Sequence, residues 1–204
     1  MVRVKICGIT CVEDALHCVE AGADALGLNF YAKSPRMCSL EQARRIVDAV
    51  ADRVLTVGVF VDATAPEIQA VIDQTGIGCV QLHGSEPPSL LERFLPHAYK
   101  ALRVADASIE QEVARFGGEY VLLDAHVPGA PGGTGRTFDW TLAEKVARSR
   151  KVALAGGLRP DNVAQAVRQV HPFCVDTASG VERERGRKDP ALVRAFIEAA
   201  RRPN

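Results

Sequence analysis

The chain alternates short apolar runs, rich in β-branched residues, with longer amphipathic stretches, and it does so eight times. The expected strands are Val2–Ile6, Ala25–Phe30, Leu55–Val61, Cys79–Leu82, Tyr99–Val104, Tyr120–Leu123, Val152–Ala155 and Phe173–Asp176. The expected helices are Asp14–Ala21, Leu40–Val50, Ala65–Gln74, Pro87–Phe94, Ser108–Phe116, Thr141–Arg148, Asn162–Gln169 and Pro190–Arg201. Continuous apolar runs indicate strands that are buried on both faces, as in a parallel sheet. Eight βα units in strict order therefore predict an α/β fold with a closed (β/α)8 TIM barrel.

The main alternative to a closed barrel is an open, doubly wound sheet. Sheets of that kind that bind dinucleotides carry a GxGxxG fingerprint after the first strand, and this sequence has none there. The 204 residues contain no linker and no low-complexity tract, and their number suits one barrel better than two domains. We therefore expect one (β/α)8-barrel domain over residues 1–204.

The charge of the chain is balanced, with 25 Lys and Arg residues against 25 Asp and Glu residues. A balanced chain has no bulk field that would attract nucleic acid or anionic lipid, so neither is expected as a partner. No apolar run is long enough to span a membrane, and the N-terminal residues do not look like an export signal, which predicts a cytoplasmic protein. The six cysteines form no CxxC pair and the five histidines form no HxH or HExxH motif. We therefore expect reduced thiols and no metal site.

The loops after strands seven and eight are the usual phosphate site of (β/α)8 barrels, whose active sites lie at the C-terminal ends of the strands. Two glycine-containing loops occupy these positions, Ala155-Gly156-Gly157-Leu158 and Thr177-Ala178-Ser179-Gly180-Val181. Glycine lets backbone amides approach an anion closely, although it also serves simply to form tight turns. Because both loops follow consecutive strands of the phosphate-binding side, we expect Gly156, Gly157, Ser179 and Gly180 to bind a phosphate group.

Cys7 ends the first expected strand and is followed by Gly8, which places it at the mouth of the barrel. A thiolate there could serve as a general base, and a modest lowering of its pKa by Lys5 or by amide dipoles would favour that role. A cysteine can equally be a small buried hydrophobic residue without a chemical role. Position alone leaves both interpretations of Cys7 open.

Asp124 follows the apolar strand Tyr120–Leu123. A carboxylate at such a position could cap a helix or pair with a nearby lysine. The helix cap is disfavoured, because a segment rich in glycine and proline follows in place of a helix. A partly desolvated pocket favours the protonated carboxyl group that a general acid needs. A base and an acid on opposite sides of the barrel suit proton removal at carbon coupled to protonation at oxygen. We expect the neighbouring segment Val127–Arg136 to be a mobile lid that excludes water.

Further polar side chains at the barrel mouth are candidates for substrate binding. Gln81 and His83 end strand four, Asp176 ends strand eight, and Arg36 lies in the loop after strand two. An arginine in such a loop is either a solvated surface charge or a clamp for a carboxylate or phosphate group. His83 is likewise either a structural histidine or a ligand contact, and its position does not decide between the two.

Seven groups of residues carry a resemblance to a known enzyme family. They are Val4–Thr10, Gly27–Phe30 with Ser34–Arg36, Gly58–Val61, Gln81–Gly84, Gly132–Gly135 with Phe138–Trp140, Leu154–Leu158, and Asp176–Glu182. In these segments, which follow the family order from residue 4 to residue 189, the chain resembles the phosphoribosylanthranilate isomerases of tryptophan biosynthesis. Each motif is moderately specific, and the ordered set is highly specific.

The resemblance implies a phosphorylated aminosugar substrate, N-(5-phosphoribosyl)anthranilate. Its product would be the 1-deoxyribulose 5-phosphate derivative, formed by an Amadori rearrangement without a metal or other cofactor. Cys7 matches the general base that removes the proton from sugar C2, and Asp124 matches the general acid that protonates the furanose ring oxygen. Arg36 matches the residue that holds the anthranilate carboxylate, and the two glycine-containing loops match the phosphate site.

One residue departs from the family pattern. Ala178 stands where the family usually has the first of two serines before the glycine. Because backbone amides are expected to make most of the phosphate contacts, we expect Ala178 to weaken binding only slightly.

Three alternative functions remain to be weighed. The histidine-pathway aminoaldose isomerases also perform an Amadori rearrangement, but their first strand ends in an aspartate where this chain has Cys7. A ribulose-phosphate epimerase would need metal-binding histidines at strand ends, and that spacing is missing. A non-catalytic phosphosugar-binding barrel would be favoured by the loss of Cys7 or Asp124, and both are present. The sequence leaves a monomer and a homodimer equally open.

Overall fold

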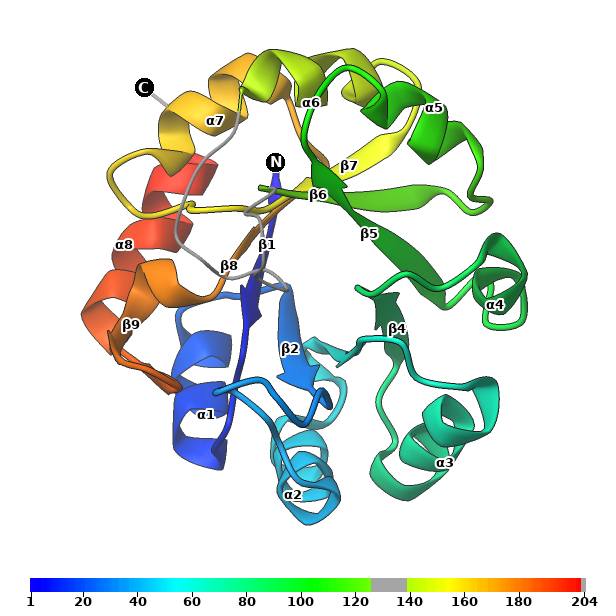
Figure 1. Cartoon of the computed structure of the whole chain (residues 1–204). Coiled ribbons are helices and arrows are strands. Elements are labelled where there is room, and N and C mark those ends of the chain that lie inside the picture. Colours follow the sequence, from blue (N-terminus) through cyan, green and yellow to red (C-terminus); the bar gives the residue numbers. More distant parts are fainter. Residues whose placement is uncertain (126–138, 203–204) are drawn as a thin grey trace.

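The computed structural model describes residues 1–125 and 139–202. Eight parallel strands close into a barrel in the order β1-β2-β3-β4-β5-β6-β7-β8, and the helices form a ring around it (Figure 1). The strands are β1 (Arg3–Cys7), β2 (Ala25–Asn29), β3 (Leu55–Phe60), β4 (Cys79–Leu82), β5 (Ala98–Val104), β6 (Tyr120–Ala125), β7 (Lys151–Leu154) and β8 (Cys174–Thr177). The helices are α1 (Val12–Glu20), α2 (Leu40–Val50), α3 (Ala65–Thr75), α4 (Pro88–Glu92), α5 (Ile109–Ala114), α6 (Trp140–Ala147), α7 (Val163–Val170) and α8 (Pro190–Arg201). The expected (β/α)8 barrel is confirmed.

The element boundaries agree with the sequence pattern to within two residues. At the start of α2, for example, Ser39 Oγ accepts a hydrogen bond from the backbone N–H of Gln42 at 3.2 Å. This cap satisfies a free donor of the first turn, so the helix begins where the sequence places a capping residue. The expected lid, Val127–Arg136, lies outside the described residues. Within the parts of the chain that are described, no helix has the length and apolarity needed to cross a membrane.

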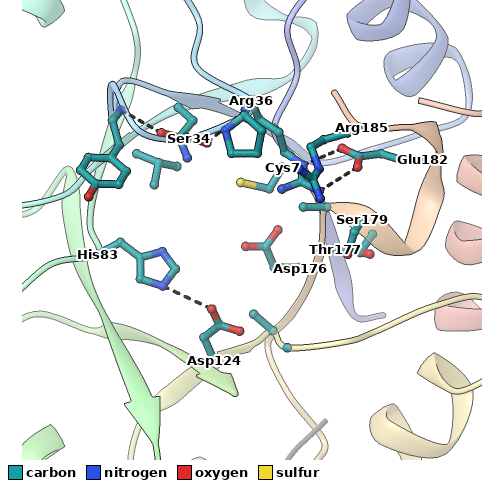
Figure 2. Close-up of a pocket in the computed structure, with 18 of the residues that line it drawn as sticks. Cys7, Ser34, Arg36, His83, Asp124, Asp176, Thr177, Ser179, Glu182 and Arg185 are labelled. Atoms are coloured by element: carbon teal, nitrogen blue, oxygen red, sulfur yellow. Dashed lines mark hydrogen bonds and ion pairs between the residues drawn. The ribbon is translucent and has the colours of Figure 1, made fainter. Parts of the chain in front are cut away.

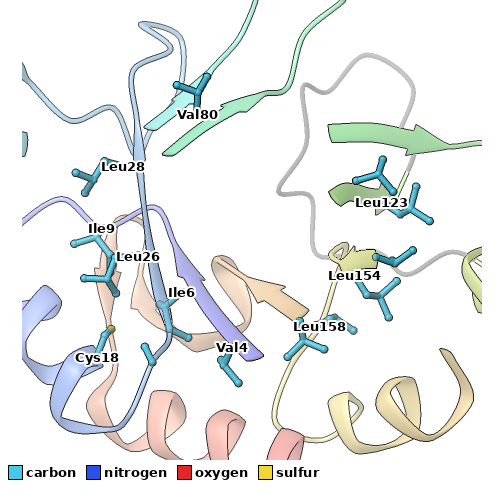
Figure 3. Packing of buried hydrophobic residues seen from close by; sticks show 14 of the residues in the cluster. Val4, Ile6, Ile9, Cys18, Leu26, Leu28, Val80, Leu123, Leu154 and Leu158 are labelled. Carbon is cyan, nitrogen blue, oxygen red and sulfur yellow. The ribbon is translucent and has the colours of Figure 1, made fainter. Parts of the chain in front are cut away.

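The main core lies between the strands and the surrounding helices. Val4 and Ile6 of β1 are fully buried there, and they pack with Leu26 and Leu28 of β2 (Figure 3). Successive side chains of a strand point to opposite faces. Because Val4 and Ile6 face the helices, Lys5 and Cys7 face the inside of the barrel.

The inside of the barrel carries small and polar side chains. Ala101, Leu122 and Ala155 form a small apolar cluster of their own, separate from the main core. Beside it Lys5 and Asp176 form a buried ion pair between β1 and β8. Small side chains leave open space at the C-terminal end of the strands. The polar side chains there provide charges and hydrogen-bonding groups within that space.

A short segment between β8 and α8 has structure that the sequence pattern did not predict. It contains a 3-10 turn, η2 (Ser179–Val181), and a two-stranded antiparallel ribbon of β9 (Glu182–Glu184) and β10 (Arg187–Lys188). A second 3-10 turn, η1 (Ala51–Arg53), follows α2. The segment between β8 and α8 shows no apolar alternation, because Val181 is its one buried apolar side chain and charged residues make up most of the ribbon. One of these charged residues, Lys188, is only 1% exposed.

Candidate active site

A cavity of about 760 Å³ opens at the C-terminal end of the barrel. Nine of the ten residues proposed from the sequence line it: Cys7, Arg36, Gln81, His83, Asp124, Gly156, Gly157, Asp176 and Ser179 (Figure 2). They come from β1, β4, β6 and β8 and from the loops after β2, β4, β7 and β8. Barrel topology thus brings together residues that are up to 172 positions apart in the sequence.

Gly180 is the tenth residue, and it is not part of the cavity lining. A Cβ at this position would overlap the carbonyl oxygen of Leu158. Thr177 Oγ1 also donates a hydrogen bond to that oxygen, at 2.7 Å. Gly180 therefore lets the loop after β8 press against the loop after β7, so the two glycine-containing loops form one continuous wall.

Cys7 lies beside the Lys5–Asp176 ion pair. Lys5 Nζ is 2.8 Å from Asp176 Oδ2, and the two side chains are only 3% and 7% exposed. Burial raises the pKa of the Cys7 thiol above its ordinary value, and the charge of Lys5 opposes that rise without cancelling it. Lys5 thus lowers the Cys7 pKa, as the sequence suggested it could, but the net shift is upward. Burial prevails because the thiol is enclosed by the barrel, where the thiolate loses its hydration.

The ion pair itself keeps its lysine charged. Burial would lower the pKa of Lys5, but the charges of Asp176 and Cys7 raise it well above its ordinary value. Burial raises the pKa of the Asp176 carboxyl group, against the effect of Lys5. Asp176 Oδ1 is buried without a hydrogen-bond partner among the described residues. An unsatisfied carboxylate oxygen that lines a cavity is available to a ligand hydroxyl group.

Asp124 ends β6 on the far side of the cavity from Cys7 (Figure 2). Its Oδ1 accepts a hydrogen bond from the backbone N–H of Ala125 at 2.8 Å. Its Oδ2 lies 3.3 Å from His83 Nε2. The ring of His83 is held at its other nitrogen, because Nδ1 is 3.0 Å from Gln81 Nε2. His83 therefore connects the ends of β4 and β6.

Arg36 is held over the cavity by a carboxylate that the sequence analysis assigned no role. Arg36 Nε and Nη2 donate to the two oxygens of Glu182 at 2.7 and 2.8 Å. Lys188 Nζ donates to Glu182 Oε1 at 2.9 Å. Hydrogen bonding to Glu182 raises the pKa of Arg36. Burial raises the pKa of Glu182, but Arg36 and Lys188 outweigh it and lower that pKa below its ordinary value.

The backbone at Gly8 makes room for this arrangement. Gly8 has a φ of 75°, a left-handed conformation that favours glycine, and a Cβ there would overlap Arg36 Cδ. The guanidinium group can therefore lie across the end of β1, next to Cys7. Two of its three nitrogens are engaged by Glu182, which leaves Nη1 for a further anion.

Three residues that support the site were missed by sequence reasoning. They are Glu182 and Lys188 beside Arg36, and Tyr99, whose hydroxyl donates to Gln81 Oε1 at 2.8 Å. Glu182 lies in a motif that resembles the family, and an acidic residue directly after the phosphate loop was the signal for it. Lys188 and Tyr99 gave no local signal, because a lone lysine in a polar segment and a tyrosine in a strand are both ordinary. Outside residues 126–138 and 203–204, no group of three or more His, Cys, Asp or Glu side chains is arranged to hold a metal ion.

Comparison with known proteins gives matches over nearly the whole chain. Residues 4–199 match the family described as N-(5'phosphoribosyl)anthranilate (PRA) isomerase. A protein of Pseudomonas fluorescens named N-(5'-phosphoribosyl)anthranilate isomerase is 47% identical over 205 residues, which cover 100% of this chain and 97% of that protein. The crystal structure of phosphoribosyl anthranilate isomerase from Thermotoga maritima has a TM-score of 0.90 and 43% identity, with 98% of this chain and 99% of that chain covered. Another structure of this isomerase, in complex with reduced 1-(o-carboxyphenylamino)-1-deoxyribulose 5-phosphate, has a TM-score of 0.86 and 42% identity over 98% of this chain and 99% of that one.

Proposed function

The chain belongs to the N-(5'-phosphoribosyl)anthranilate isomerase family, and on that premise we propose that it converts N-(5-phosphoribosyl)anthranilate to 1-(2-carboxyphenylamino)-1-deoxyribulose 5-phosphate by an Amadori rearrangement. The observation that carries the proposal is that a cysteine, a carboxyl group, an arginine and two glycine-containing loops line one cavity. We place the reaction in tryptophan biosynthesis and the protein in the cytoplasm. We also take residues 1–204 to be one domain.

The first step opens the sugar ring. Asp124 donates its proton to the furanose ring oxygen, the bond from C1 to that oxygen breaks, and the lone pair of the anthranilate nitrogen forms a Schiff base at C1. Asp124 becomes a carboxylate as the proton leaves. The backbone N–H of Ala125, 2.8 Å from Oδ1, and the ring of His83, 3.3 Å from Oδ2, face that developing charge.

The second step moves a proton at carbon. The Cys7 thiolate removes the C2 proton, the electrons of that bond form the C1–C2 double bond, and the Schiff base nitrogen becomes an amine. The resulting enol then takes up a proton at C1 and loses one from its hydroxyl group to give the ketone. The ammonium group of Lys5 acts electrostatically on Cys7 and favours its thiolate, as the base requires.

The substrate is held at both ends. The anthranilate carboxylate is assigned to Arg36, whose Nη1 is not used by Glu182. The phosphate is assigned to the wall formed by the loops after β7 and β8, where Gly156, Gly157 and Ser179 line the cavity. Asp176 Oδ1, which lacks a partner among the described residues, is assigned to a sugar hydroxyl group.

The test is a fluorescence assay that follows the loss of freshly made phosphoribosylanthranilate in the presence of EDTA. The wild type is expected to turn the substrate over, and Cys7→Ser and Asp124→Asn are each expected to lose about 10²–10⁴ in kcat, the usual contribution of a general base or acid. Cys11→Ser is the matched control for Cys7, because Cys11 lies just before α1 and is not part of the cavity lining.

Two outcomes would contradict the proposal. If Cys7→Ser kept more than about a tenth of the wild-type kcat, the base would be another group. If the wild type were inactive but still bound a labelled phosphosugar, the assigned reaction would be wrong, and the aminoaldose of the histidine pathway would be the next substrate to try.

A further inference from the structure

A chain of polar contacts runs from inside the barrel to the carboxyl group of Asp124. The Tyr99 hydroxyl donates to Gln81 Oε1 at 2.8 Å. Gln81 Nε2 lies 3.0 Å from His83 Nδ1. His83 Nε2 lies 3.3 Å from Asp124 Oδ2 (the dashed line between these two residues in Figure 2).

The chain begins at a residue outside the substrate cavity. Tyr99 is not part of the lining of the 760 Å³ cavity, but it does line a smaller cavity of about 220 Å³ whose other residues lie at the opposite, N-terminal end of the strands. Gln81 is 1% exposed, which leaves little of it for a ligand to touch. Gln81 does line the substrate cavity, but its amide oxygen and nitrogen already contact Tyr99 and His83.

The direction of the hydrogen bonds follows from the donors and acceptors available. A tyrosine hydroxyl that donates to the amide oxygen of Gln81 turns the amide N–H groups toward His83. An amide N–H facing Nδ1 makes Nδ1 an acceptor, so the proton of a neutral imidazole sits on Nε2. That proton faces Asp124, whose Oδ2 lies 3.3 Å from Nε2. The contact falls short of a well-formed hydrogen bond, because Nε2 has no hydrogen-bond partner among the described residues.

The opposite direction would leave two lone pairs facing each other once Asp124 has given up its proton. If the Gln81 amide were reversed, Nδ1 would carry the proton and Nε2 would present a lone pair to Asp124 Oδ2. Oδ1 already accepts from Ala125, so the carboxylate would gain no second donor. With the Tyr99 hydroxyl as donor, one N–H group instead lies beside each oxygen of the Asp124 carboxylate.

We propose that Tyr99 and Gln81 are positioning residues that fix His83 as the Nε2–H tautomer, so that His83 stabilises the carboxylate that Asp124 becomes when it protonates the substrate. The inference rests on the proposed function for the role of Asp124, and it gives Gln81 a role different from the direct substrate contact expected from the sequence. Burial raises the pKa of the Tyr99 hydroxyl well above its ordinary value, so the group remains a donor at neutral pH.

The decisive variant is Tyr99→Phe, which removes one hydroxyl group and keeps the ring. Nuclear magnetic resonance of protein labelled with ¹⁵N-histidine distinguishes the two tautomers, and His83→Asn identifies the His83 signals among those of the five histidines. The wild type is expected to show protonated Nε2 at His83. In Tyr99→Phe the Gln81 amide is free to reverse, so a mixture of tautomers is expected.

The same variant is expected to lower kcat by about 10-fold and to change KM by less than about 2-fold, because the lost interaction acts on the acid and not on substrate binding. In a His83→Asn background, Tyr99→Phe is expected to have no further effect, since its influence passes through His83. Tyr120→Phe is the matched control. It removes a hydroxyl group beside the same lower cavity, outside the chain of contacts, and is expected to change neither the His83 signals nor kcat.

Two results would overturn the inference. One is a wild type whose His83 carries its proton on Nδ1, or a His83 signal that Tyr99→Phe leaves unchanged. The other is a loss of kcat in Tyr99→Phe that persists in full in the His83→Asn background. The tautomer measurement needs no substrate, so it tests the hydrogen-bond chain even if the wild type proves inactive on phosphoribosylanthranilate and the proposed function fails.

Discussion

Cys7 and Asp124, on opposite sides of the cavity, are surrounded by different kinds of interaction. On the base side, Cys7 lies beside the buried ion pair of Lys5 and Asp176, so full charges act on it. On the acid side, Asp124 is contacted by a backbone N–H and by His83, whose ring is held through the side chain of Gln81. Charge therefore acts on the Cys7 thiol on the base side, whereas the orientation of neutral donors acts on the Asp124 carboxyl group on the acid side.

The difference follows from what each group must do. A thiol must lose its proton in an enclosed place where burial favours the neutral form, and only a nearby cation offsets that effect. A carboxyl group that donates a proton must first hold it, and a permanent cation at the same distance would favour its loss too early. Neutral donors stabilise the carboxylate only as it forms. The base side should therefore be sensitive to the removal of charge, and the acid side to the loss of orientation.

The largest effect is expected when the base side loses its cation. Lys5→Met keeps much of the side-chain volume but leaves Asp176 without its partner. Without the ammonium group the Cys7 pKa should rise further, because Lys5 opposes the effect of burial. The thiolate population should therefore fall, and kcat with it, by about 10- to 1000-fold. Steady-state kinetics measure the rate. Chemical denaturation should also show a loss of about 3–5 kcal/mol of stability, the usual result of breaking a buried ion pair.

The double variant Lys5→Met/Asp176→Asn separates the two effects of that change. It removes both charges, so stability should largely return while the rate stays low. If the double variant recovered wild-type kcat, Lys5 would matter for folding alone and the charge-based account of the base side would be wrong.

The pH dependence of Cys7 reactivity is the next largest effect. Because burial raises the Cys7 pKa above the ordinary thiol value of 9.0, the thiolate fraction should still be growing at that pH. Inactivation by iodoacetamide should therefore accelerate about 10-fold per pH unit and continue to do so beyond pH 9.0. Peptide mapping identifies the alkylated residue, and Cys7→Ser serves as the control that should resist alkylation at this position. A plateau below pH 9.0 would show that the ion pair outweighs burial.

The arginine clamp should respond in binding more than in rate. In Glu182→Gln the neutral amide no longer holds Arg36 and Lys188 with a full charge. We expect KM to rise about 10-fold and kcat to change by less than about 2-fold, because Arg36 contacts a part of the substrate that does not react. Glu198→Gln, an exposed position on α8 that is not part of the cavity lining, is the matched control and should leave both constants unchanged. A fall in kcat at unchanged KM would instead connect Glu182 with the chemistry of Cys7.

The sequence predicted the fold and the location of most site residues for one physical reason. Strand ends of a barrel meet at one face, so Cys7 and Asp124 could be placed there without coordinates. The net pKa of Cys7 could not be predicted, because it depends on the balance between burial and an ion pair whose members are 171 residues apart. The hold of Glu182 on Arg36 spans 146 residues. Such pairs leave no periodic trace in a sequence, because each partner is a single polar residue in a loop or strand.

The smallest effect is expected at Ala178, in the loop that continues β8 beyond Asp176. The carbonyl of Ala178 accepts a hydrogen bond from Lys188 Nζ at 3.0 Å, which fixes the backbone of the loop whatever side chain it carries. Restoring the family's serine with Ala178→Ser adds one hydroxyl group near the proposed phosphate position and leaves the Lys5–Asp176 pair untouched. We therefore expect KM to fall by no more than about 2- to 3-fold, the net value of a weak hydrogen bond, with kcat unchanged.

Steady-state kinetics of Ala178→Ser and Ser179→Ala, measured in parallel, compare the gain of one hydroxyl group in this loop with the loss of another. A 10-fold fall in KM for Ala178→Ser would mean that side-chain hydroxyls, and not backbone amides, carry the phosphate contact, and the phosphate wall would then have to be rebuilt around Ser179.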